Sequence, residues 1–263
     1  MQAAQKPATQ QPRSSNRNTL PRVTELPLPT VADVPPLPLR ATLATGIFPD
    51  LDRDIRFLKR PLLARLFAPQ EQGEQQHTLM VTSDLPEAGK SFISRNLAAS
   101  FAQEKMLRVL LVDADPVRRS LSNLLGVADR PGLMELIAGD AVQLSDVTLA
   151  TDVEALYFVP AGQSREDATE LLASTQMAAF LTALNDPNTV VVLDSPPLLL
   201  SSEGRVLADN ARQVLVVVEA GRSTAADVAQ VVDILRGTSA TVSIAMNKVP
   251  VAALSYRHDM YYR

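Results

Sequence analysis

The stretch from residue 78 to residue 101, TLMVTSDLPEAGKSFISRNLAASF, contains the three parts that decide the fold. Its first part, residues 79–83, is a continuous apolar run of the kind found in strands that are buried on both faces. Its last part has apolar residues at four-residue spacing, at Ile93, Leu97 and Phe101, which predicts a helix. A strand that passes through a short loop into a helix is the first unit of an α/β fold.

The loop between this strand and this helix has the residues of a phosphate-binding P-loop. Lys90 can reach the β- and γ-phosphates of a nucleotide, and the hydroxyl of Ser91 can ligate Mg²⁺. Backbone N–H groups at the start of a helix attract anions, and Gly89 allows the backbone to approach them closely. The standard pattern has a glycine where this chain has Asp84. The alternative to a P-loop is a Gly-Lys turn that caps an ordinary helix.

The rest of the chain continues the alternation of strands and helices. Helical patterns separate further continuous apolar runs, which predicts a mostly parallel sheet with helices on both faces. Ligands of such sheets bind at the carboxyl ends of the strands. The further strands are expected at residues 109–115, 156–161, 190–196, 214–220 and 242–248.

Acidic residues close two of these expected strands. Asp113 and Asp115 end the second strand, where alternation would put both carboxylates on the same side, and Asp194 ends another. A P-loop enzyme needs carboxylates near Mg²⁺, one to hold the metal and one to activate the attacking oxygen. A single aspartate at such a place is often only a turn or cap residue. Three aspartates in this order after a P-loop favour a functional site.

Two segments precede the α/β unit. Residues 1–48 are rich in Pro, Gln, Ser and Thr and are expected to form a disordered arm, which serves as a linker or a docking segment. Residues 49–70 form an expected basic amphipathic helix that is broken or restarted at Pro61. The Gln- and Glu-rich residues 71–76 are expected to link this helix to the domain.

The α/β domain is expected over residues 77–250, and a tail follows it at residues 251–263. Three of the four tyrosines of the chain lie in this tail, at Tyr256, Tyr261 and Tyr262. Chance gives such clustering rarely. A flexible polar tail can reach an active site on its own molecule or on a neighbour, which makes these residues candidate substrates.

The overall composition excludes several classes of protein. The net charge is −4, so no basic field would attract nucleic acid, and the absence of cysteine rules out disulfides and cysteine-bound metals. Neither a membrane-spanning apolar run nor a secretory signal is recognised. The two histidines, His77 and His258, are expected to be exposed to solvent rather than to bind a metal.

From about Arg53 to the C-terminus, the chain resembles the bacterial tyrosine kinases of exopolysaccharide synthesis, the BY-kinases. The segments that carry the resemblance are SDLPEAGKS (83–91), VLLVDADPVRRSL (109–121), VVVLDSPP (190–197) and the tyrosine-containing tail. The segment IRFLKRPLL (55–63) looks like the basic helix of the exosortase-associated subgroup.

The resemblance implies an enzyme that transfers phosphate from ATP, with Mg²⁺, to protein tyrosine. Catalytic roles would fall to Lys90, Asp113 and Asp115, with Asp113 acting as the base. ATP would be bound by Glu87, Ala88, Gly89, Lys90, Ser91, Phe92 and Asn247. Mg²⁺ would be held by Ser91, Asp113 and Asp194, and autophosphorylation would occur at Tyr256, Tyr261 and Tyr262. Arg118 matches the arginine that follows the second Walker motif.

The resemblance also implies partners and a location. The expected partners are a membrane-embedded activator, further copies of the chain and a cognate tyrosine phosphatase, and the expected location is the cytoplasm, at the inner membrane through a partner. The Glu-x-x-Arg-x-x-Arg helix of family oligomers would map onto Arg53, Arg56 and Lys59, without its acidic residue.

Two other functions stay open. A partitioning ATPase of the ParA/MinD type shares the P-loop branch, but its signature lysine would stand where this chain has Leu85. A nucleotide-binding scaffold without catalytic activity is consistent with the unusual loop. Turnover of ATP would separate the scaffold from the enzymes, and phosphotyrosine would separate the kinase from the partitioning ATPase.

Overall fold

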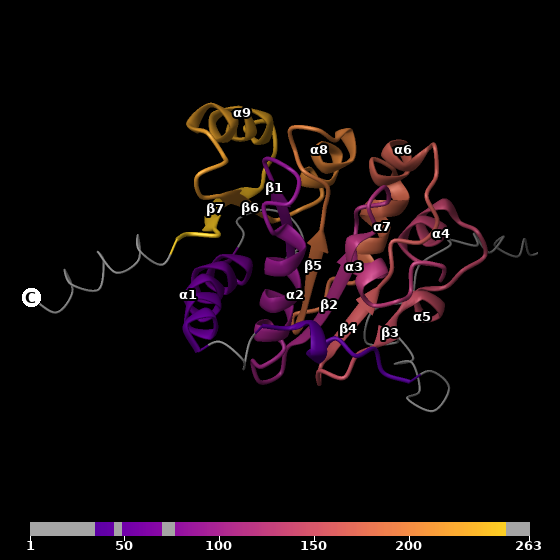
Figure 1. Cartoon of the computed structure of the whole chain (residues 1–263). Helices are drawn as coiled ribbons and strands as arrows, with labels where there is room; N and C mark the ends of the chain where they lie inside the picture. Colours follow the sequence, from indigo (N-terminus) through magenta and orange to yellow (C-terminus); the bar gives the residue numbers. More distant parts are fainter. Residues whose placement is uncertain (1–34, 45–48, 70–76, 251–263) are drawn as a thin grey trace, which may run out of the picture.

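The computed structural model of the chain describes residues 35–44, 49–69 and 77–250 (Figure 1). Its centre is a seven-stranded sheet with the strand order β3-β4-β2-β5-β1-β6-β7, in which β3 is antiparallel to its neighbour and the other strands are parallel. The strands are β1 (Thr78–Ser83), β2 (Arg108–Asp113), β3 (Leu149–Ala150), β4 (Leu156–Val159), β5 (Thr189–Asp194), β6 (Gln213–Glu219) and β7 (Thr241–Asn247).

Apolar side chains alternate between two buried faces of the sheet because successive residues of a strand point in opposite directions. Leu79 and Val81 face one core, which is covered by α1 (Pro49–Leu66), α2 (Lys90–Phe101) and α3 (Ser120–Leu124). Met80 faces the other core. The helices over this second face are α4 (Leu133–Ala138), α5 (Leu144–Val147), α6 (Ala168–Leu172), α7 (Thr175–Ala183), α8 (Ser202–Ala208) and α9 (Ala225–Leu235).

The strand register places the acidic residues beside the P-loop. Asp113 at the end of β2 is level with Asp194 at the end of β5, and Val81 of β1 is also level with Asp194. The carboxyl ends of three adjacent strands therefore meet at one edge of the sheet, as expected for a ligand site in a parallel sheet.

All six strands predicted from continuous apolar runs are present, although several end earlier than expected. β2, for example, stops at Asp113 rather than at residue 115. The prediction missed β3, because a two-residue strand is too short to carry a hydrophobic pattern.

The prediction of disorder for residues 1–48 is wrong for residues 35–44. Leu37, Leu39 and Leu43 are buried in the core on the side of α1, and the backbone N–H of Leu37 donates to the carbonyl of Ala150 at 2.9 Å. A short 3₁₀ turn, η2 (Arg40–Thr42), lies between them. Proline-rich composition hid these three leucines, which give this short segment enough apolar surface to pack. The rest of the arm lies outside the described residues.

Helix α1 is continuous through Pro61, so the predicted break is wrong. Pro61 and Phe57 are both exposed. Water can therefore satisfy the carbonyl of Phe57, which loses its helical hydrogen bond to the proline. Lys59 anchors the helix to α2, because its Nζ donates to the carbonyl of Ser100 at 3.1 Å and to Glu104 at 2.6 Å.

His77 is buried, so the prediction that it is exposed is wrong. Its ring stacks on Phe67, just after α1, with 4.2 Å between centroids, and burial lowers its pKa. His258, the predicted linker at 71–76 and the tyrosine-containing tail lie outside the described residues. Among the helices of residues 35–44, 49–69 and 77–250, none is long and apolar enough to cross a membrane.

Candidate functional site

The loop of residues 84–89 joins β1 to α2 and places glycine where glycine is needed. Gly89 has a φ of 102° at the start of α2, a backbone conformation that other residues rarely adopt. A Cβ on Gly89 would also overlap the side-chain nitrogen of Asn247. Both facts explain why glycine is needed at this position, while its close approach to phosphate stays a prediction.

Two residues of the loop depart from the usual glycine-rich pattern, and each is unfavourable for the stability of the loop. Glu87 is exposed but has a φ of 66°, in a left-handed region that a side chain destabilises by about 1–2 kcal/mol. Asp84 is fully buried, and neither carboxylate oxygen has a hydrogen-bond partner among the described residues. Burial of a polar group without a partner is also destabilising.

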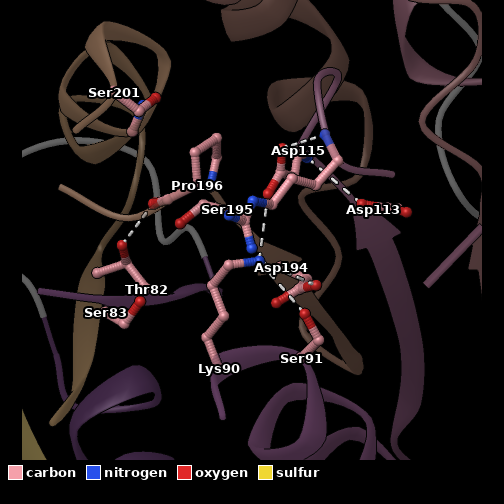
Figure 2. A network of polar contacts seen from close by, with 12 residues as sticks. Thr82, Ser83, Lys90, Ser91, Asp113, Asp115, Asp194, Ser195, Pro196 and Ser201 are labelled. Atoms are coloured by element: carbon pink, nitrogen blue, oxygen red, sulfur yellow. Dashed lines mark hydrogen bonds and ion pairs between the residues drawn. The ribbon is translucent and has the colours of Figure 1, made fainter. Parts of the chain in front are cut away.

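Lys90 extends from the start of α2 between two buried carboxylates (Figure 2). Its Nζ lies 3.2 Å from Oδ2 of Asp115 and 3.8 Å from Oδ2 of Asp194. Burial alone would lower the pKa of Lys90, but the two carboxylates, with Asp113 behind them, outweigh it and raise the pKa. The lysine is therefore a fixed cation in the centre of the site.

The carboxylates of Asp113 and Asp115 point to different partners, so the prediction that they share one side is wrong. Strand alternation does not extend to Asp115 because β2 ends at Asp113. Oδ2 of Asp113 accepts hydrogen bonds from the backbone N–H and the hydroxyl of Ser122, both at 2.8 Å. Asp115 faces Lys90 and accepts a bond from the backbone N–H of Arg118 at 2.9 Å.

Asp113 is a buried carboxyl group whose pKa lies near neutral pH. Burial, reinforced by the negative charge of Asp194, raises the pKa of Asp113 to about 7, against the opposing hydrogen bonds from Ser122. Burial also raises the pKa of Asp194, while Lys90 opposes that change. A carboxyl group with a pKa near the working pH can accept a proton in a reaction and release it afterwards.

Two serines that sequence analysis did not select hold these carboxylates. Ser94 of α2 donates to Oδ1 of Asp194 at 2.9 Å, and Ser122 of α3 holds Asp113. Ser94 follows Lys90 by four residues, so helical spacing could have placed it on the same face. No comparable signal marks Ser122, because its approach depends on where α3 packs.

The remaining predicted residues take different positions. The hydroxyl of Ser91 lies 3.3 Å from Nζ of Lys90, inside the site. Phe92 is partly buried, with the guanidinium of Arg95 stacked over its ring at 5.0 Å. The side chain of Asn247 donates to the carbonyl of Ala88 at 2.9 Å and so lies against the loop. Contact of Asn247 with adenine stays a prediction, and all three predicted phosphorylation sites lie outside the described residues.

The oxygen atoms around Lys90 fit a magnesium ion. Oδ2 of Asp115 and Oδ2 of Asp194 are buried without a hydrogen-bond partner among the described residues, and both lie within 4 Å of Nζ of Lys90. The Ser91 hydroxyl interacts with both Lys90 and Asp194. No cluster of three or more acidic or histidine residues forms a metal cage in the described ranges. Mg²⁺ in nucleotide sites needs no such cage, because one or two carboxylates and the phosphates hold it.

The fold and this site define a P-loop nucleotide-binding domain. Residues 79–253 match the family described as the CobQ/CobB/MinD/ParA nucleotide binding domain, and the chain belongs to it. The chain is 33% identical over 212 residues to a putative tyrosine-protein kinase, EpsB, of Ralstonia nicotianae. That match covers 80% of this chain and 28% of EpsB, so the chain spans less than a third of this relative's length.

Two solved kinase domains have the same fold at similar identity. The kinase domain of the Escherichia coli tyrosine kinase ETK has a TM-score of 0.62 and 31% identity, covering 66% of this chain and 68% of that domain. The BceF tyrosine kinase domain has a TM-score of 0.63 and 30% identity, covering 74% of this chain and 78% of that domain. Within the P-loop class, the chain belongs to the bacterial tyrosine kinase family, the BY-kinases.

Proposed function

We propose that the chain is an ATP-dependent protein-tyrosine kinase that phosphorylates Tyr256, Tyr261 and Tyr262 of its own C-terminal segment. The observation that carries the proposal is the arrangement around Lys90: a buried cation between Asp115 and Asp194, beside a carboxyl group of neutral pKa, at the end of a P-loop. We infer tyrosine as the acceptor of the phosphate from membership of the BY-kinase family, because a P-loop alone does not show whether phosphate passes to tyrosine or to water.

The residues of the loop would bind the nucleotide. The backbone N–H groups from Glu87 to Phe92 would face the phosphates, and Lys90 would contact them with its charge. Ser91 and Asp194 would hold Mg²⁺, with Oδ2 of Asp115 close to them. The ion, when bound, neutralises charge on the phosphates. Asn247 would contact the adenine after its side chain leaves the carbonyl of Ala88.

The transfer step needs a base and an aligned acceptor. The tyrosine oxygen attacks the γ-phosphorus of ATP, the bond from that phosphorus to the β–γ bridging oxygen breaks, and ADP leaves. Asp113 receives the proton of the tyrosine hydroxyl, since its pKa of about 7 allows it to be ionised before the step and protonated after it. Asp115 keeps Lys90 directed at the phosphates.

We further propose that the kinase regulates polymerisation and export of an exopolysaccharide, as a member of the exosortase-associated subgroup. A membrane-embedded activator would recruit it from the cytoplasm to the inner membrane, copies of the chain would present tails to one another, and a tyrosine phosphatase would reverse the reaction. Nucleic acid is not an expected partner, because the chain is acidic overall.

Two observations favour a second function, a nucleotide-binding scaffold without catalysis. Asp84 puts a buried carboxylate without a partner into the loop, and Glu87 has a strained backbone conformation. Negative charge near the phosphates opposes nucleotide binding. Catalytic turnover of ATP separates this function from the kinase.

The acceptor is tested with the variant Tyr256→Phe/Tyr261→Phe/Tyr262→Phe, incubated with γ-labelled ATP and Mg²⁺ beside the wild-type chain. We expect the variant to lose nearly all incorporated label and to keep its affinity for ATP, because the changes lie outside the P-loop. The matched control is Tyr157→Phe, which alters the one tyrosine outside the tail and should keep the label. Equal labelling of wild type and triple variant would contradict the proposed acceptors.

A further inference from the structure

Side chains at or just after the C-terminal ends of β6 and β7 donate hydrogen bonds to three successive carbonyl groups of the P-loop. The carbonyl of Pro86 accepts a hydrogen bond from Nη1 of Arg222 at 2.9 Å, and the carbonyl of Glu87 accepts one from Nζ of Lys248 at 2.8 Å. The third carbonyl, of Ala88, is the one bound by Asn247. Each donor lies 136 or more residues from its acceptor in sequence, so the contacts come from the tertiary fold.

A single carboxylate joins the two cations of this group. Glu219, the last residue of β6, pairs with Arg222 at 3.2 Å and with Lys248 at 3.1 Å. The hydrogen bond from Lys248 is the main reason that the pKa of Glu219 is lowered, so this carboxylate stays ionised at neutral pH. We call Glu219, Arg222 and Lys248 the carbonyl clamp.

The geometry of a phosphate-binding loop explains why such contacts matter. Successive backbone N–H groups bind an anion when they point into one concavity, and the carbonyls of the same peptides must then point away from it. Donors that hold these carbonyls from outside therefore fix the direction of the N–H groups inside. The loop needs this support because Glu87 has a left-handed backbone conformation without being glycine.

Stability of the fold is a weaker explanation for the clamp. The side chains of Arg222 and Lys248 are 45% and 46% exposed, and ion pairs at such exposure contribute little to stability. β6 and β7 are already paired along seven residues, from Gln213↔Thr241 to Glu219↔Asn247. The clamp is thus placed to act on the loop rather than on the sheet.

We propose that Arg222 and Lys248, joined by Glu219, are positioning residues that preset the P-loop for the phosphates of a nucleotide. The inference goes beyond the proposed kinase function, because preset N–H groups would serve any nucleotide, whether or not phosphate is transferred to tyrosine.

The test is the affinity of the full chain for Mg-ADP, measured by titration calorimetry, with the thermal midpoint of the nucleotide-free protein measured in parallel. We expect Lys248→Met and Arg222→Met each to weaken ADP binding by about 3- to 10-fold, as for loss of a partly exposed charged hydrogen bond. The thermal midpoint should stay near that of wild type. Lys248→Arg should restore most of the affinity, because arginine can still reach the carbonyl and Glu219.

The matched control is Arg236→Met, which removes the same kind of charge from an exposed pair with Asp233 at the end of α9 and should leave ADP binding unchanged. Wild-type affinity for ADP in both clamp variants would overturn the inference. A loss of affinity that Lys248→Arg fails to restore would also overturn it, as would a loss accompanied by a lower thermal midpoint. If the wild-type chain binds ADP but does not phosphorylate its tyrosines, the proposed kinase function is wrong and this inference is unaffected. Failure of the wild-type chain to bind ADP overturns both.

Discussion

Two features of the surroundings of Asp113 have opposite effects on the pKa of this single residue. Burial and Asp194 raise its pKa to about 7, while two hydrogen bonds from Ser122 stabilise its ionised form. The same carboxyl group has a pKa near 3.8 in an unfolded chain. The folded protein therefore holds one more proton than the unfolded chain between these two values.

This difference predicts how stability depends on pH. A raised folded pKa contributes stability that is fully present below about pH 4 and is lost as pH rises through about 7, because the folded state must then carry a buried charge. Relative to wild type, Asp113→Asn should gain free energy of unfolding, on the order of a few kcal/mol, as pH rises through this window. Chemical denaturation at several pH values, without nucleotide or Mg²⁺, measures it. A difference that is constant with pH, or that grows toward acid, would contradict the shift.

For individual residues, the sequence predicted which ones lie together in the site but not which partners their side chains contact. The P-loop and the strand-end aspartates could be found because their spacing follows the chain. The sequence could not predict that Asp113 and Asp115 have different partners. It also could not predict the contacts made by Ser122, Arg222 and Lys248, because these depend on where α3 packs and where β7 ends against the loop.

At the scale of the element, α1 is joined to the domain by a buried stripe and by contacts at its C-terminal end. Ile55, Leu62 and Leu66 are buried, and the guanidinium of Arg212 donates to the carbonyls of Arg65 and Ala68. Cations are favourable at a helix C-terminus, where carbonyls lack helical partners. The helix is therefore part of the domain core rather than a separate arm.

Substitutions on the two faces of α1 test this docking. Leu62→Ala should lower the free energy of unfolding by about 2–4 kcal/mol, because it leaves a cavity between α1 and the sheet. Phe57→Ala is the matched control on the same helix; its ring is 67% exposed, so we expect a change within about 0.5 kcal/mol. Denaturant titration of both variants measures the two values. Similar small losses in both would show that α1 is not docked.

The elements that sequence analysis found and missed differ in how their apolar residues are arranged. Continuous runs such as residues 109–112 are clear because both faces of β2 are buried. Leu37 and Leu39 were hidden among prolines, and β3 has only two residues. The sequence predicts a break at Pro61, because a proline inside a helix is tolerated only where its position faces solvent, and the surrounding pattern does not show which face Pro61 occupies.

At the scale of the whole molecule, the sheet register brings together residues that lie far apart in the sequence. Lys90, Asp115 and Asp194 meet because β1, β2 and β5 are neighbours and end at one edge. The strand–helix alternation was enough to predict this edge as the site. The proposed function is the transfer of phosphate at this edge to the tyrosines of the tail.

The most direct test is intact-mass and peptide mass spectrometry of the full chain after incubation with Mg-ATP, with and without a cognate activator segment. Lys90→Met is the main control, and its folding must be checked, because it leaves Asp115 and Asp194 buried without their cation. Ser91→Ala is a milder second control. We expect phosphate on Tyr256, Tyr261 or Tyr262 in the wild type. In both controls we expect at least a tenfold loss, equivalent to about 1.4 kcal/mol in transition-state stabilisation. Equal phosphate in wild type and controls, or none in the wild type even with the activator segment, would contradict the proposed function.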